Sequence, residues 1–150
     1  MSSQENKQLV MRGYQLFKNN DINGLLELYT DDIEWKGADS EYVPFFGTYK
    51  GKNQVAQFFT KMDQAQEAIQ FEPQAFIAEN DKVIVTGQSI WLVKSTGQRY
   101  ENPWVHIFTL RDGKVAKFQQ YNDTAAVEAA YRPSQTSTQQ KKTQNITKHN

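Results

Sequence analysis

The chain has 150 residues, with 17 Lys and Arg against 17 Asp and Glu, so its formal charge at neutral pH is zero. This length predicts a single domain with one full hydrophobic core. The absence of cysteine excludes disulfides, thiol catalysis and cysteine-ligated zinc. The lack of a basic excess argues against a dedicated nucleic-acid-binding protein.

The zero charge is the sum of two unequal parts. Residues 132–150 contain four basic residues and no acidic ones, so residues 1–131 carry the opposite charge of −4. All 19 aromatic residues lie in 1–131, whereas Ile146 is the one aliphatic residue of the last segment. Such a composition buries too little apolar surface to offset the entropy of ordering. We predict one folded domain over 1–131 and a disordered basic tail over 132–150.

No targeting or membrane segment is evident in the sequence. The first eight residues lack the apolar stretch of a signal peptide. No apolar run approaches the roughly 20 residues that a transmembrane helix needs. We therefore expect a soluble, cytoplasmic protein.

The first half of the chain predicts helices around one short strand. Apolar residues recur at helical spacing from Leu9 to Phe17, and Asp21 is a typical cap for a second helix that carries Leu25 to Tyr29. A strand is expected over 33–36 and an aromatic-rich loop over 37–51. A third helix follows, with its apolar positions at Val55, Phe58, Phe59 and Met62.

The second half changes to an alternation of period two, which is typical of strands. Four strands are predicted, joined by short turns that make neighbours antiparallel: 69–78, 82–94, 98–110 and 114–122. Asp123 is positioned to cap a last helix over 124–131, which Pro133 ends. Helices followed by a meander predict an α+β fold in which the helices cover one face of the sheet.

Aromatic residues sit where this sheet would face the helices. If Trp104 points toward the helices, strand alternation sends His106 and Phe108 the same way. A curved sheet covered by helices leaves a cavity where its lining is incompletely filled. The alternative is that these rings make an ordinary core. Expected walls of the cavity are Trp35, Phe46, Trp91, Trp104, Phe108, Phe118 and Gln120, although the parity of Trp91 also allows an outward position.

Segments in three parts of the chain resemble the nuclear transport factor 2 superfamily. Asp21 to Leu25 and Tyr29 to Trp35 are similar to its opening, and Pro44 to Gly51 with Val55 to Phe59 resembles its SnoaL-like, ketosteroid-isomerase-related branch. The run from Phe108 to Val115, and on to Thr124, carries the same likeness. The resemblance implies a cone-shaped α+β barrel, a deep pocket and a homodimer formed across the sheet.

The resemblance does not carry over a known catalytic set. Ketosteroid isomerase uses an aspartate base, with a tyrosine and a protonated acid as oxyanion donors. The tyrosine position falls on Gly13, next to Tyr14; the base position falls on Gly37, and the protonated acid falls on His106. Limonene epoxide hydrolase uses an Asp-Arg-Asp set, of which Asp123 alone matches a position. The acid that SnoaL-type cyclases carry on the last strand is replaced by Gln120.

His106, Asp123 and Tyr14 remain as the candidate catalytic residues. His106 is the one histidine of the predicted domain, and a histidine titrates near neutral pH. Asp123 is equally explained as a helix cap, and Tyr14 as a core residue. Nothing has the spacing of a metal site, a phosphate loop or a dinucleotide fingerprint, so no metal or cofactor is expected.

Two functional hypotheses follow from these residues. The first is a cofactor-free isomerase, cyclase or hydrolase that acts by proton transfer on a small apolar compound with a carbonyl or epoxide group. The second is a non-catalytic module that binds a small hydrophobic molecule or supports a dimer, because fold alone does not fix function. Both predict no nucleic acid and no membrane as partner. An open cavity at His106 with a carboxylate beside it would favour the enzyme.

Overall fold

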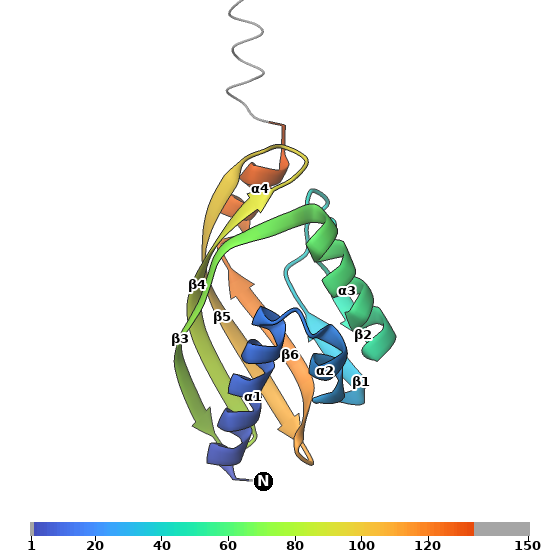
Figure 1. Ribbon diagram of the computed structural model, residues 1–150, viewed down its shortest axis with the longest axis vertical. Helices are drawn as coiled ribbons and strands as arrows, with labels where there is room; N and C mark the ends of the chain where they lie inside the picture. The colour runs from blue at the N-terminus through green and yellow to red at the C-terminus, as the bar shows by residue number, and fades with distance from the viewer. Residues whose placement is uncertain (1, 134–150) are drawn as a thin grey trace, which may run out of the picture.

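The computed structural model describes residues 2–133, which form four helices and six strands (Figure 1). The elements in chain order are α1 (Ser3–Lys18), α2 (Ile22–Glu27), β1 (Tyr29–Lys36), β2 (Thr48–Lys50), α3 (Lys52–Ala65), β3 (Gln66–Glu79), β4 (Lys82–Val93), β5 (Arg99–Arg111), β6 (Lys114–Asn122) and α4 (Thr124–Tyr131). The tail predicted over 132–150 lies outside the described residues apart from Arg132 and Pro133.

The six strands form one curved, open sheet in the order β2-β1-β6-β5-β4-β3. All neighbours are antiparallel except β1 and β6, which run parallel. Helices α1, α2 and α3 lie on the concave side of this sheet, as Figure 1 shows, and α4 lies near one end. The predicted α+β class, with three N-terminal helices on a curved, mostly antiparallel sheet, is confirmed.

Two local predictions were wrong. Thr48–Lys50 was expected to be loop but forms β2, because Tyr49 turns into the core while its neighbours stay exposed. Tyr29 was expected to close the second helix but begins β1 instead. That helix ends at Glu27, and the carbonyl of Leu28 accepts a bond from the backbone N–H of Val115 at 2.9 Å, which starts the strand pairing.

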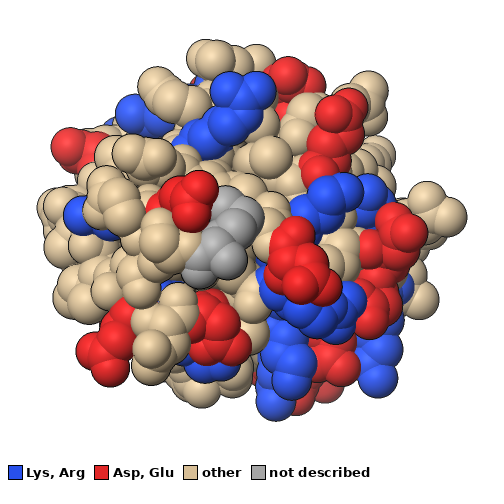
Figure 2. Space-filling model, turned by 90° about the horizontal axis from the view of Figure 1, so that it is seen from below, with Lys and Arg blue, Asp and Glu red and all other residues tan. Residues whose placement is uncertain are grey.

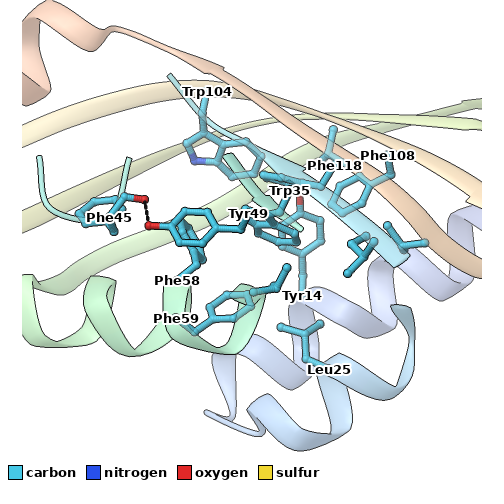
Figure 3. Close-up of a cluster of buried hydrophobic side chains, with 14 of the residues drawn as sticks. Tyr14, Leu25, Trp35, Phe45, Tyr49, Phe58, Phe59, Trp104, Phe108 and Phe118 are labelled. Atoms are coloured by element: carbon cyan, nitrogen blue, oxygen red, sulfur yellow. Dashed lines mark hydrogen bonds between the residues drawn. The ribbon is translucent and has the colours of Figure 1, made fainter. Parts of the chain in front are cut away.

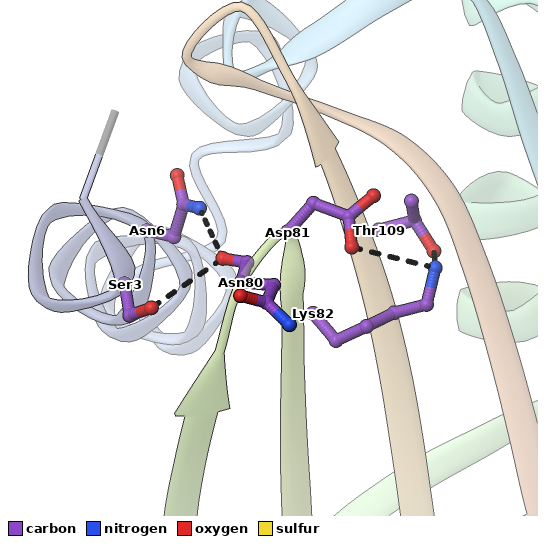
Figure 4. A network of polar contacts seen from close by, with 6 residues as sticks. All are labelled: Ser3, Asn6, Asn80, Asp81, Lys82 and Thr109. Carbon is purple, nitrogen blue, oxygen red and sulfur yellow. Dashed lines mark hydrogen bonds and ion pairs between the residues drawn. The ribbon is translucent and has the colours of Figure 1, made fainter.

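Side-chain caps fix the ends of three helices. Ser2 and Glu5 form a reciprocal capping box at α1, and Asp21 and Asp123 cap α2 and α4. The start of α1 is also tied to the turn between β3 and β4. Ser3 Oγ and Asn6 Nδ2 both donate to the backbone carbonyl of Asn80, at 3.5 and 3.3 Å (Figure 4). Helix α1 is therefore held at a fixed position over the sheet.

Aromatic rings dominate the layer between the helices and the sheet (Figure 3). Trp35 of β1 stacks on Phe118 of β6, with ring centroids 3.8 Å apart. Phe58 and Phe59 of α3 pack edge-on against each other, and Phe59 also packs edge-on against Trp35, whereas Phe58 is tilted against it. Aromatic side chains therefore make up much of the layer between the helices and the sheet.

The outer surface carries charges of both signs. In the face shown in Figure 2, Lys and Arg side chains lie interspersed with Asp and Glu. Within residues 2–133, no helix is long and apolar enough to cross a membrane.

Candidate functional site

A cavity of about 90 Å³ lies between the helices and the concave face of the sheet. By the space that one water needs, this holds roughly six water molecules or a small ring compound. Its lining is largely aromatic and aliphatic, and within residues 2–133 it contains no Asp or Glu. Nine predicted site residues line it: Tyr14, Trp35, Phe46, Trp91, Trp104, His106, Phe108, Phe118 and Gln120.

The alternation of β5 places its key residues in this cavity. Side chains from Tyr100 to Leu110 are buried at every second position, so Trp104, His106 and Phe108 share the inward face as the sequence predicts. On β6, Phe118 pairs with Phe108 and Gln120 pairs with His106. Trp91 also points inward, not to the outer face.

Tyr14 and His106 form a hydrogen-bonded pair inside the cavity. The Tyr14 hydroxyl lies 2.6 Å from His106 Nδ1, and both side chains are buried. Helix α1 brings the tyrosine and β5 brings the histidine, from positions 92 residues apart in sequence. The Trp104 indole stacks on the imidazole, with ring centroids 3.9 Å apart. The stacked indole and the hydrogen bond to Tyr14 together fix the plane of the imidazole.

Burial keeps both members of the pair neutral at neutral pH. It lowers the pKa of His106 from 6.5 to about 3, with the Gln120 side chain working weakly in the opposite direction. Burial likewise raises the pKa of Tyr14 well above its ordinary value. The two side chains are therefore joined by one hydrogen bond between neutral groups. With so low a pKa, His106 is a weak base, whereas Tyr14 keeps a hydroxyl for hydrogen bonding.

Asp123 does not reach the cavity. Its side chain is exposed and accepts a bond from the backbone N–H of Ala126 at 3.2 Å, as the cap of α4. Asp123, which the sequence suggested as a catalytic partner of His106, is thus a helix cap, the alternative that the sequence also allowed.

A second polar group at the cavity was not predicted from the sequence. Its members are Gln66, Ser89, Tyr100 and Asn102, all buried. Tyr100 donates to Gln66 Oε1 at 2.8 Å, and Ser89 donates to the backbone carbonyl of Asn102 at 3.3 Å. The sequence carries a signal for part of this group, because Ser89 on β4 and Asn102 on β5 are polar residues at inward positions of otherwise apolar strand faces.

Metal ligands are not clustered in the described part of the chain. No group of three or more His, Cys, Asp or Glu side chains in residues 2–133 is arranged to hold a metal ion.

The sequence and the fold are similar to known proteins. The family model described as the SnoaL-like domain matches residues 10–118. An NTF2-like protein from Burkholderia xenovorans LB400 is 34% identical, with a TM-score of 0.81; the match covers 88% of this chain and 99% of that one. None of the curated proteins matches the sequence.

Two further solved structures are 25% identical to the chain. One is an NTF2-like protein of unknown function from Burkholderia pseudomallei K96243, with a TM-score of 0.77, covering 85% of this chain and 95% of that one. The other is TerC, which was co-crystallized with polyporic acid; its TM-score is 0.76, covering 85% of this chain and 98% of that one.

Proposed function

This chain belongs to the SnoaL-like domain family of the NTF2-like superfamily, and on that premise we propose that its cavity binds a small, uncharged, ring-bearing carbonyl compound. The observation that carries the proposal is a neutral Tyr14–His106 pair inside an aromatic cavity. A charged ligand would lose its hydration without gaining an opposite charge there. The co-crystal of TerC with polyporic acid supports a small organic molecule as the ligand class.

In the proposed reaction, Tyr14 polarises the carbonyl of the bound molecule. When His106 carries its proton on Nδ1, that N–H donates to the tyrosine oxygen and leaves the phenol hydrogen for a ligand oxygen. Negative charge that develops on the carbonyl oxygen is then stabilised by a donor already in place. An isomerase or cyclase that passes through an enol uses such a donor, and so does a hydrolase acting on an epoxide.

A non-catalytic binding protein is the second candidate. Two observations favour it: no carboxylate among residues 2–133 lines the cavity, and the pKa of His106 is about 3. A proton abstracted from the substrate therefore has no strong acceptor beside it. In this case Tyr14 orients a ligand carbonyl and no bond is broken.

A small β,γ-unsaturated ketone separates the two candidates. We would mix wild type, Tyr14→Phe and His106→Asn with 3-cyclohexenone and follow formation of the conjugated 2-cyclohexenone by absorbance. If the protein is an enzyme, wild type should isomerise 3-cyclohexenone faster than buffer alone does. This rate should fall about 100-fold in Tyr14→Phe, the usual effect of losing one oxyanion donor. Binding of 2-cyclohexenone without turnover would support the binding protein. Absence of both binding and turnover would contradict the proposed function.

A further inference from the structure

Two buried polar atoms at the cavity have no hydrogen-bond partner. They are the side-chain oxygen of Asn102, a residue only 4% exposed, and the indole nitrogen of Trp104, which is 3% exposed. Both residues lie on the inward face of β5 and line the cavity. Folded proteins leave very few buried polar atoms unpaired, so each such atom calls for an explanation.

Nearby polar atoms on the same wall are already paired within the protein. The Trp91 indole donates to Ser89 Oγ at 2.9 Å, and the hydroxyls of Tyr100 and Tyr131 both donate to Gln66 Oε1 at 2.8 and 2.5 Å. The other unpaired buried side-chain atoms in residues 2–133, on Asn6 and Thr30, belong to residues that do not line the cavity. The remaining two unpaired atoms, one donor and one acceptor, therefore belong to neighbouring inward residues of β5 that line the cavity.

The Trp104 indole is held in place by its neighbours, so its N–H is not free to turn toward another acceptor. The ring lies stacked between Phe71 and His106, with centroids 5.2 and 3.9 Å away. It also lies against Gly87 of β4, where a side-chain carbon would overlap the indole. Figure 3 shows the indole reaching from the sheet toward the helices.

We propose that Asn102 and Trp104 together bind a hydroxyl group of the ligand. A hydroxyl is both an acceptor and a donor, so one oxygen can accept from Trp104 Nε1–H and donate to Asn102 Oδ1. This proposal rests on the proposed function, in which the ligand carbonyl meets Tyr14. It names the substrate class more narrowly, as hydroxy-carbonyl compounds.

The arrangement of residues on β5 limits the shape of the ligand. Asn102, Trp104 and His106 occupy successive inward positions of β5, each about 7 Å from the next along the strand. The hydroxyl lies between the first two residues and the carbonyl lies at the Tyr14–His106 pair. Because the Trp104 and His106 rings lie 3.9 Å apart, a single benzene ring with its hydroxyl and carbonyl groups in para positions is the ligand shape that we expect to reach both sites.

Four ring compounds of similar size test this inference by isothermal titration calorimetry. They are 4-hydroxyacetophenone, acetophenone, 4-methoxyacetophenone and 2-hydroxyacetophenone. We expect wild type to bind 4-hydroxyacetophenone at least 10-fold more tightly than acetophenone, about the difference that one well-placed hydrogen bond makes. The methoxy compound lacks the donor, and the 2-hydroxy compound has its hydroxyl bonded to its own carbonyl, so both should lose this advantage.

Variants assign the effect to the two residues. In Asn102→Leu and in Trp104→Phe, the dissociation constants for acetophenone and 4-hydroxyacetophenone should become nearly equal. Asn6→Leu makes the same change at a buried asparagine outside the cavity and should keep the wild-type ratio. If Trp104→Phe does not fold, the chemical shift of the Trp104 indole N–H in NMR spectra of wild type gives the same information. It should move downfield with 4-hydroxyacetophenone and stay in place with acetophenone.

The results separate this inference from the function on which it rests. Equal affinity of wild type for 4-hydroxyacetophenone and acetophenone would overturn the hydroxyl site, with ordered water as the partner of the two atoms, and leave the carbonyl site standing. A hydroxyl preference that Asn102→Leu and Trp104→Phe both retain would also overturn it. Absence of binding by all four compounds would overturn the proposed function and this inference together.

Discussion

His106 makes the stability of this fold depend on pH. Its pKa is about 3 in the folded protein, because burial disfavours the charged imidazolium, whereas an exposed histidine has a pKa of 6.5. Between these values the unfolded chain binds a proton that the folded chain does not. The free energy of unfolding therefore rises with pH across this window, and the stability is fully present above 6.5.

The size of the effect follows from the shift. Each pH unit within the window changes the free energy of unfolding by about 1.4 kcal/mol for one such group. Acidification from about pH 7 to about pH 4.5 spans nearly two units of that window and should cost about 2–3 kcal/mol. For a domain of this size that lowers the melting temperature by roughly 6–15 °C.

Urea unfolding of wild type and His106→Asn at several pH values measures this contribution. The asparagine amide offers Tyr14 a partner but does not titrate. Carboxylates titrate in both proteins and cancel in the difference, and His149→Asn controls for loss of the other histidine. We expect the stability of wild type to fall relative to His106→Asn by about 1.4 kcal/mol per pH unit below about pH 6. Parallel pH dependences for the two proteins would refute a neutral, buried His106.

Three further predictions concern the site and the sheet. Tyr14→Phe leaves Nδ1 of His106 buried without its partner and should cost about 1–3 kcal/mol in urea unfolding; a loss below about 0.5 kcal/mol would contradict this. Gly87→Ala places a carbon against Cζ2 and Cη2 of Trp104, closer than any side-chain contact allows, and should lower the stability by about 1–3 kcal/mol and shift the indole N–H signal of Trp104 in NMR spectra; an unchanged signal and melting temperature would be the contrary result. We also propose a homodimer across the outer face of the sheet, where Ile107 is only partly buried, so Ile107→Lys should give a monomer by light scattering, and a monomeric wild type would exclude it.

Periodicity and capping carried most of the fold prediction. Alternation along β5 was enough to place Trp104, His106 and Phe108 on one face, because a strand has only two faces. The capping residues at Asp21 and Asp123 marked helix starts for the same local reason. β2 was missed because three residues give too short a pattern, and its pairing with β1 depends on a loop between them that no periodicity describes.

The site was predictable only in part, because its chemistry depends on distances between segments. Tyr14 and His106 each stood out as polar groups on an apolar face, but their hydrogen bond joins a helix and a strand 92 residues apart. Asn102 drew no attention in the sequence. Asn102 matters because its side-chain oxygen has no hydrogen-bond partner, and a missing contact cannot be inferred from the order of residues.

The Tyr14–His106 pair and the unpaired atoms of Asn102 and Trp104 are expected to contribute differently to binding and to reaction. A ligand carbonyl at Tyr14 accepts the phenol hydrogen while His106 donates to the tyrosine oxygen, and this bond becomes stronger as negative charge develops on the carbonyl oxygen, so it contributes more to the transition state than to ground-state binding. A hydroxyl at Asn102 and Trp104 displaces no protein–protein bond, so its contribution goes into affinity. Loss of the tyrosine hydroxyl should thus reduce turnover more than binding, and loss of the indole N–H should reduce binding more than turnover. This contrast distinguishes a reactive carbonyl from a recognised hydroxyl within one cavity.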